Sequence, residues 1–125
     1  MNIYLAAVGI QDSGNLGALA RLCHNFSLAG LITISKACKV DERAYRRSTH
    51  GSNYLDDLIE YSSIQEFAAD MDYTIGLSAR LAGSRSFERK VEPLPLIFDD
   101  LRKMPYRTLA IVLGPESTGL SNNDL

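Results

Sequence analysis

Two segments of the sequence carry residue types that could do chemistry. The first runs from Asn15 to Arg21 and reads NLGALAR, and the second runs from Gly114 to Leu120 and reads GPESTGL. Arg21 lies opposite the apolar stripe of a predicted helix, where a solvated side chain is the simpler interpretation. In the second segment, two glycines and a proline shape a turn whose backbone amides can face a ligand. Glu116 could accept hydrogen bonds from that ligand or only buttress the turn.

The small residues of the first segment are more informative than its ends. Asn15 alone is typical of a helix N-terminal cap. Gly17 lowers helix stability relative to alanine, so we expect it to let another part of the molecule approach closely.

Familiar catalytic and cofactor motifs are missing. The chain contains no GxGxxG, GxxxxGK[ST], HExxH or GxSxG pattern, so dinucleotide, nucleoside triphosphate, zinc protease and serine hydrolase sites have no support. Its histidines are His24 and His50, which we expect to be structural or solvated. Neither they nor the cysteines have metal-ligand spacing, so no metal is expected.

Apolar runs alternate with helical patterns along the chain and predict the order β-α-β-α-β-α-β-α-β. The predicted strands span 3–8, 31–34, 58–61, 73–77 and 108–113, and the predicted helices span 15–28, 41–50, 63–69 and 98–104. This order indicates an α/β fold with a mostly parallel sheet and helices on both faces. Ligands bind such sheets at the carboxyl ends of the strands, so the loops 9–14, 78–95 and 114–119 are expected to form the site.

The ends of the first predicted helix follow from its pattern. Leu16, Leu19, Cys23 and Phe26 fall on one stripe and are expected to face the core. Gly30 would close this helix as a C-terminal glycine.

Length and composition bound the class of protein. The 125 residues are enough for one domain, 1–125, with a net charge of −2 and no run long enough to span a membrane. No secretory leader is evident, and two cysteines suit a reducing cytoplasm. The weak net charge argues against coating nucleic acid by bulk attraction, but local patches can still bind it. Basic residues do cluster, either as solvated faces or as phosphate contacts: Arg43, Arg46 and Arg47 in one group, and Arg80, Arg85 and Arg89 in another.

Taken together, these segments resemble the SPOUT superfamily of S-adenosylmethionine-dependent RNA methyltransferases, closest to the TrmH/TrmJ ribose 2′-O-methyltransferases. Residues 15–34, which begin with NLGALAR, are similar to the family's motif 1. Residues 111–122, IVLGPESTGLSN, are similar to motif 2, and residues 76–80, GLSAR, resemble a strand-and-loop segment of the TrmJ branch. The resemblance covers the whole chain, with the motifs in the family's order.

The resemblance implies a fold, a cofactor and an assembly. The fold would be a SPOUT-type α/β trefoil knot, and the protein would be a homodimer with active sites near the subunit interface. S-adenosylmethionine would bind among loops around the knot. By position, the residues lining its pocket would be Leu77, Ser78, Ala79, Gly114 and Glu116.

The resemblance also implies a reaction, transfer of a methyl group to an RNA ribose 2′-hydroxyl. Arg21 matches the family's arginine at the reaction centre, and Asn15 matches its motif asparagine. An arginine stays protonated and cannot be the base, but it can hold a phosphate and stabilise an incipient alkoxide. A tRNA anticodon loop suits recognition through splayed bases, with ribosomal RNA as the other substrate. The two arginine clusters would contact phosphates.

One departure from the family qualifies these expectations. The family's motif 3, which completes knot and pocket, does not occur before the last residue, Leu125. We expect a fragment of a longer protein, with the C-terminal knot segment missing, rather than a degenerate copy; either would put the activity of this chain in doubt. The competing hypothesis is a non-catalytic SPOUT-like module for RNA binding or dimerisation.

Overall fold

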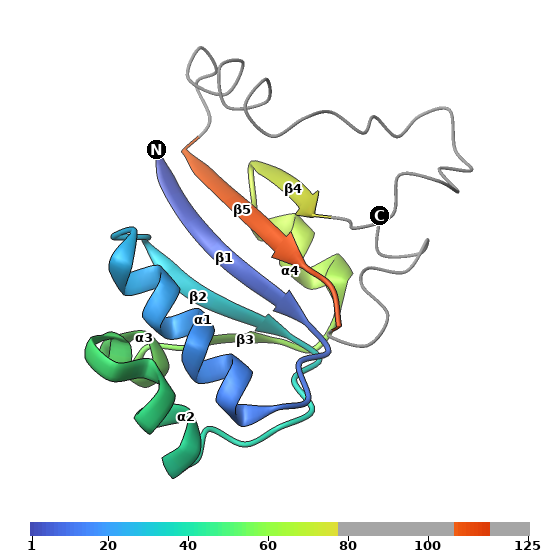
Figure 1. Cartoon of the computed structure of the whole chain (residues 1–125). Helices are drawn as coiled ribbons and strands as arrows, with labels where there is room; N and C mark the ends of the chain where they lie inside the picture. The colour runs from blue at the N-terminus through green and yellow to red at the C-terminus, as the bar shows by residue number, and fades with distance from the viewer. Residues whose placement is uncertain (78–106, 116–125) are drawn as a thin grey trace.

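A five-stranded parallel sheet forms the centre of the molecule in the computed structural model, which describes residues 1–77 and 107–115 (Figure 1). Its strands are β1 (Asn2–Val8), β2 (Gly30–Ile34), β3 (Ile59–Tyr61), β4 (Tyr73–Leu77) and β5 (Thr108–Leu113). They lie in the order β3-β2-β1-β5-β4, and every neighbouring pair is parallel. The predicted parallel sheet is therefore confirmed, and the boundaries predicted for β4 and β5 match those observed.

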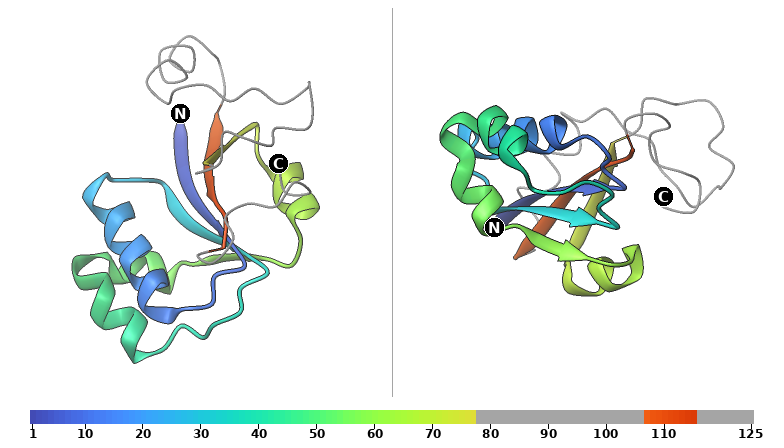
Figure 2. Two further views of the ribbon diagram at one scale, coloured as in Figure 1. Left: turned by 45° about the vertical axis from the view of Figure 1, so that its right-hand side comes forward. Right: turned by 90° about the horizontal axis from the view of Figure 1, so that it is seen from below.

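Helices cover both faces of the sheet, as expected (Figure 2). They are α1 (Ser13–Asn25), α2 (Glu42–Ser48), the 3-10 turn η1 (Thr49–Gly51), α3 (Ser52–Asp56) and α4 (Ile64–Asp70). The first four lie together on one face, and α4 lies on the other. The predicted helix 98–104 and the implied knot fall outside the described residues.

The side chains of β1 alternate between two cores because successive residues of a strand point to opposite faces. On one face, Leu5 packs with Leu16 and Ala20 of α1. On the other face, Ala6 packs with Phe67 of α4, which is 1% exposed. The central strand β1 is thus buried on both sides, which is typical of a continuous apolar run in a parallel sheet.

Helix α1 begins two residues earlier than predicted. Its N-terminal cap is Asp12, whose carboxylate accepts hydrogen bonds from the backbone N–H groups of Gly14 (2.7 Å) and Asn15 (3.2 Å). Asn15 therefore lies in the first turn and is not the cap. Asp is as good a cap as Asn, so the pattern allowed either residue.

The C-terminal end of α1 also differs from the prediction. The helix ends at Asn25, and Ser27 takes the left-handed conformation (φ 52°) that usually selects glycine. The backbone N–H groups of Ser27 and Leu28 donate to the carbonyls of His24 (3.2 Å) and Cys23 (3.0 Å), which is a Schellman arrangement. Gly30 instead opens β2, and the predicted core position of Phe26 is wrong, since its side chain is 69% exposed.

The segment predicted as one helix over 41–50 is divided in three. Asp41 caps α2 by accepting a hydrogen bond from the N–H of Ala44 (3.1 Å). Thr49 then has a positive φ of 50°, which ends α2, and η1 and α3 continue to Asp56. Helix α4 begins at Ile64, one residue after the predicted start, because Ser63 is its cap: the Ser63 hydroxyl accepts from the N–H of Glu66 (3.2 Å).

Candidate functional site

The carboxyl ends of β1 and β5 lie side by side and form the base of the candidate site. Ala7 pairs with Leu113 in the parallel register, and the loops after the two strands remain together. Gly9 has φ +63°, and a Cβ atom added to it would lie 3.5 Å from the Pro115 side chain. The N–H of Gly9 donates to the carbonyl of Ile34 (2.8 Å). The loop after β1 is therefore held between β2 and the loop after β5.

Two of the residues predicted to line a cofactor pocket are described, and the structure brings them together. Leu77 ends β4 and pairs with Leu113, the residue before Gly114, and both Leu77 and Gly114 are half-buried. They lie at the carboxyl edge, where parallel sheets bind ligands. The other three, Ser78, Ala79 and Glu116, fall outside the described residues.

The two predicted reaction-centre residues both lie on α1 and both are exposed. Asn15 lies in the first turn, next to the carboxyl edge. Arg21 lies six residues further on, which corresponds to roughly 9 Å along the helix axis. Helical side chains lean toward the N-terminus of their helix, and the N-terminal end of α1 is the end next to the carboxyl edge.

Helices α1 and α2 pack unusually closely, and Gly17 makes this possible. A Cβ atom added to Gly17 would lie 2.2 Å from the backbone oxygen of Ala44 and 2.7 Å from the Cβ of Arg47. One turn further, a Cβ atom added to Gly51 would lie 2.4 Å from the carbonyl oxygen of Ala20. The expectation that Gly17 admits a close neighbour is confirmed, and that neighbour is α2.

The basic cluster on α2 lies beside α1, although its arginines have different surroundings. Arg43 forms an ion pair with the Asp12 cap (3.5 Å). Arg46 and Arg47 are exposed and form no ion pair within the described part of the chain. The second predicted cluster, Arg80, Arg85 and Arg89, falls outside that part.

A lysine that sequence reasoning missed anchors the loop after β2 at the same carboxyl edge. The Lys36 ammonium donates to the carbonyl of Cys38 and forms an ion pair with Glu60 (3.4 Å), and its side chain is only 16% exposed. The sequence does not signal this role, because Glu60 is brought near Lys36 only by the pairing of β2 with β3. Lys36 fixes the loop from which α2 begins.

The histidines and cysteines take no part in a metal cluster among residues 1–77 and 107–115. His24 and His50 are both exposed, with ring centroids 6.1 Å apart across the α1–η1 contact. Burial raises the pKa of the Cys23 thiol to about 12, and Cys23 and Cys38 form no disulfide. Cys23 is therefore a core residue and not a nucleophile. No helix in the same residues is long and apolar enough to cross a membrane.

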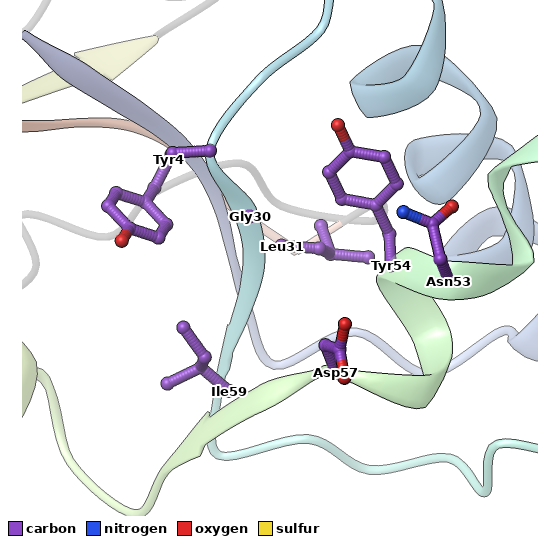
Figure 3. Close-up of a pocket in the computed structure, with 8 residues that line it drawn as sticks. Tyr4, Gly30, Leu31, Asn53, Tyr54, Asp57 and Ile59 are labelled. Atoms are coloured by element: carbon purple, nitrogen blue, oxygen red, sulfur yellow. The ribbon is translucent and has the colours of Figure 1, made fainter.

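A small hollow of about 230 Å³ lies at the opposite, amino-terminal edge of the sheet (Figure 3). Tyr54, one of its walls, donates its hydroxyl hydrogen to the carbonyl of Leu28 (2.7 Å). The hollow lies beside the start of β2, away from the loops that follow the strands, so we do not place the site there. It is lined by Tyr4, Ala29, Gly30, Leu31, Asn53, Tyr54, Asp57 and Ile59.

Comparison with known proteins identifies the family of this chain. The model of the SpoU rRNA Methylase family matches residues 2–125. The tRNA (cytidine-2′-O-)-methyltransferase TrmJ of Methanocaldococcus jannaschii is 29% identical over 123 residues, which are 98% of this chain and 53% of that protein. The chain thus spans about half the length of the curated relatives that it matches.

Solved structures share the fold. A probable methylase family protein from Haemophilus influenzae is 28% identical, with a TM-score of 0.85 over 98% of this chain and 51% of that one. The SpoU methyltransferase AviRb from Streptomyces viridochromogenes, solved in complex with the cofactor AdoMet, is 22% identical, with a TM-score of 0.70 over 98% of this chain and 46% of that one.

Proposed function

The chain belongs to the SpoU rRNA methylase family, and from this premise we propose that it serves S-adenosylmethionine-dependent methylation of RNA ribose 2′-hydroxyls. One observation of the structure carries the proposal. The two segments that resemble motifs 1 and 2 lie far apart in sequence, yet β1, which leads into the first, and β5, which holds the start of the second, are adjacent parallel strands. The loops that follow these strands lie close together, since a Cβ atom added to Gly9 would be 3.5 Å from the Pro115 side chain.

The proposed substrate is tRNA, with ribosomal RNA as the second choice. The M. jannaschii relative is a tRNA (cytidine-2′-O-)-methyltransferase by name, whereas the family as a whole is named for rRNA. We further propose that residues 1–125 form one methyltransferase domain, acting in the cytoplasm where these RNAs are modified.

The described residues fit S-adenosylmethionine at the carboxyl edge. Leu77 offers an apolar wall, and Gly114 leaves room for a ligand to approach the backbone. Ser78, Ala79 and Glu116 are proposed to complete this pocket. When bound, the cofactor supplies a methyl group that a sulfonium activates toward nucleophiles.

In this proposal Arg21 positions the RNA and stabilises negative charge. Its guanidinium stays protonated, so it cannot remove the proton of the 2′-hydroxyl. It can bind a neighbouring phosphate with two hydrogen bonds and stabilise the oxygen as that proton leaves. Asn15, nearer the carboxyl edge, is proposed to act at the same reaction centre.

The RNA backbone is proposed to lie across α1 and α2. Helix α2 lies beside the helix that carries Arg21, so one nucleic-acid strand could contact both helices. The two basic clusters supply the candidates for phosphate contacts: Arg43, Arg46 and Arg47 in one, and Arg80, Arg85 and Arg89 in the other.

A homodimer is also proposed. Leu22 (40% exposed) lies on α1 directly after Arg21, and Phe26 (69% exposed) lies one turn later, at the C-terminal cap of the helix. Apolar side chains grouped on one helix face favour burial against a partner. A partner on this face would lie close to the reaction centre. The oligomeric state of the protein with Phe26→Asp, compared by sedimentation with the unaltered protein, tests this interface.

The test of the function is a titration of S-adenosylhomocysteine combined with Arg21→Ala. The expected result is that the variant binds S-adenosylhomocysteine as well as the unaltered protein does and loses at least a hundredfold in methyl transfer, roughly the cost of one transition-state charge contact. Arg21→Ala with full turnover would remove the proposed role. RNA binding without cofactor binding by the unaltered protein would favour a non-catalytic module.

A further inference from the structure

Helices α1 and α2 run side by side in the same direction, and their contacts define a register. Gly14 lies against Arg43, Gly17 against Arg47, and the backbone at Arg21 against Gly51. The register continues to the His24–His50 ring pair. Each residue of α1 thus has a defined neighbour on α2 or η1.

This register places two arginine side chains on one strip of surface. Arg47 begins beside Gly17, since their Cβ positions would be 2.7 Å apart. Arg21 lies one turn after Gly17 on the same helix face, and its side chain leans back over that turn. Because Gly17 has no side chain, α1 presents only backbone where Arg47 approaches it. Both arginine side chains are expected to lean toward the N-terminal ends of their helices, which follow the carboxyl edge of the sheet.

The two arginines carry positive charge that the described residues leave uncompensated. Among those residues, neither Arg21 nor Arg47 forms an ion pair, and the nearby rings are the histidines His24 and His50. Two like charges on one strip of surface repel each other. An anion bound between them would relieve this repulsion.

The other two arginines of α2 lack this arrangement. Arg43 already has a carboxylate partner in Asp12 (3.5 Å). Arg46 projects from α2 about 100° away from Arg47 and lies one turn after Glu42, whose carboxylate is on its side of the helix. Arg46 and Arg47 are thus adjacent, exposed and identical in type, and only Arg47 borders α1.

We propose that Arg47 is a phosphate-binding residue that acts together with Arg21 on the RNA backbone, and that Arg46 adds only long-range attraction. The inference rests on the proposed function for the identity of the ligand. The inference identifies Arg47 as the arginine of the α2 cluster that contacts the RNA backbone. It also gives a reason for a glycine at position 17, where α1 meets Arg47.

The experiment compares Arg47→Ala with the matched control Arg46→Ala. Both changes remove one positive charge. If RNA binding depended only on overall charge, the affinity would therefore fall equally in the two variants. Affinity for unmodified tRNA transcript is measured by fluorescence anisotropy from 50 to 200 mM salt, with methyl transfer measured in parallel. Alanine keeps the Cβ atom of Arg47 that contacts Gly17, so the variant is expected to fold, and urea unfolding checks this.

The expected result is an affinity about tenfold lower for Arg47→Ala, the size of one charge-assisted contact, and at most about twofold lower for Arg46→Ala. The slope of log affinity against log salt concentration should become shallower by about one unit, the equivalent of one phosphate contact, for Arg47→Ala but not for Arg46→Ala. Arg47→Lys should recover part of the affinity, because it restores charge without the guanidinium fork.

Equal losses in the two alanine variants, or no loss in either, would overturn the inference while the unaltered protein still binds and methylates RNA. If instead the unaltered protein neither binds nor methylates RNA, the proposed function fails and takes the inference with it. The unaltered protein therefore distinguishes the two failures.

Discussion

The contact between α1 and α2 leads to a quantitative prediction for Gly17→Ala. The added Cβ atom would lie 2.2 Å from the backbone oxygen of Ala44 and 2.7 Å from the Cβ of Arg47. Neither atom is the end of a flexible side chain, so α2 must move as a whole. Overpacking of this kind costs about 1–3 kcal/mol, whereas replacing a helical glycine by alanine contributes about 1 kcal/mol of propensity. The difference is a net loss of stability of up to about 2 kcal/mol.

Gly14→Ala is the matched control on the same helix. Its added Cβ atom would meet the Arg43 Nε and the Asp12 carboxylate, both at 3.0 Å, and these side-chain atoms can move aside. Because the shift needed is only a few tenths of an ångström, and part of it falls on the Asp12 cap, the variant should stay close to the unaltered protein in stability and be more stable than Gly17→Ala. Urea unfolding measures the stability of both variants, and the midpoints can be compared directly when the m-values equal that of the unaltered protein. Equal midpoints for the two variants would refute the close-packing argument.

Three further changes test local features of the fold by the same unfolding measurement. Ser27→Gly should stabilise the protein by about 0.5–1 kcal/mol, because Ser27 has a left-handed φ of 52°; a loss would contradict the Schellman assignment. Thr33→Val should stabilise it by about 1 kcal/mol, because the fully buried Thr33 hydroxyl has no hydrogen-bond partner among the described residues; a large loss would reveal a partner. The backbone N–H of Ala44 lowers the pKa of Asp41, so the capping carboxylate stabilises the fold above about pH 4 and loses this contribution as the pH falls through the lowered value. Asp41→Asn should therefore be less stable than the unaltered protein at pH 6, with the difference shrinking toward pH 3, and a constant difference would exclude this titration.

The strands could be predicted from the sequence because each is a short apolar run with clear ends. The boundaries of β4 and β5 were predicted without error, since a glycine or a polar residue follows each run. The ends of α1 were not, because Asp12 and Asn15 are equivalent caps by residue type and because Ser27 takes a conformation typical of glycine. Cap choice depends on which backbone N–H groups the carboxylate reaches, and residue type alone does not fix this.

The sequence indicated the edge of the sheet at which a ligand is expected to bind. It did not indicate which residues contact one another there. Strand order and the parallel-sheet rule indicated the carboxyl edge, where Leu77 and Gly114 do lie together. The contact of Gly9 with Pro115 and that of Gly17 with α2 join segments far apart in the sequence. Such contacts follow from tertiary packing, so the sequence indicated only that Gly17 would have a close neighbour.

The central claim is tested most directly by identifying the methylated nucleoside. The protein is incubated with S-adenosylmethionine and unmodified tRNA or ribosomal RNA transcripts, and the digested RNA is analysed by mass spectrometry. The expected product is a nucleoside with its methyl group on the ribose 2′-oxygen, formed by the unaltered protein and lost with Arg21→Ala. A methyl group on a base, or none from a protein that binds both cofactor and RNA, would contradict ribose methylation as the function of this site.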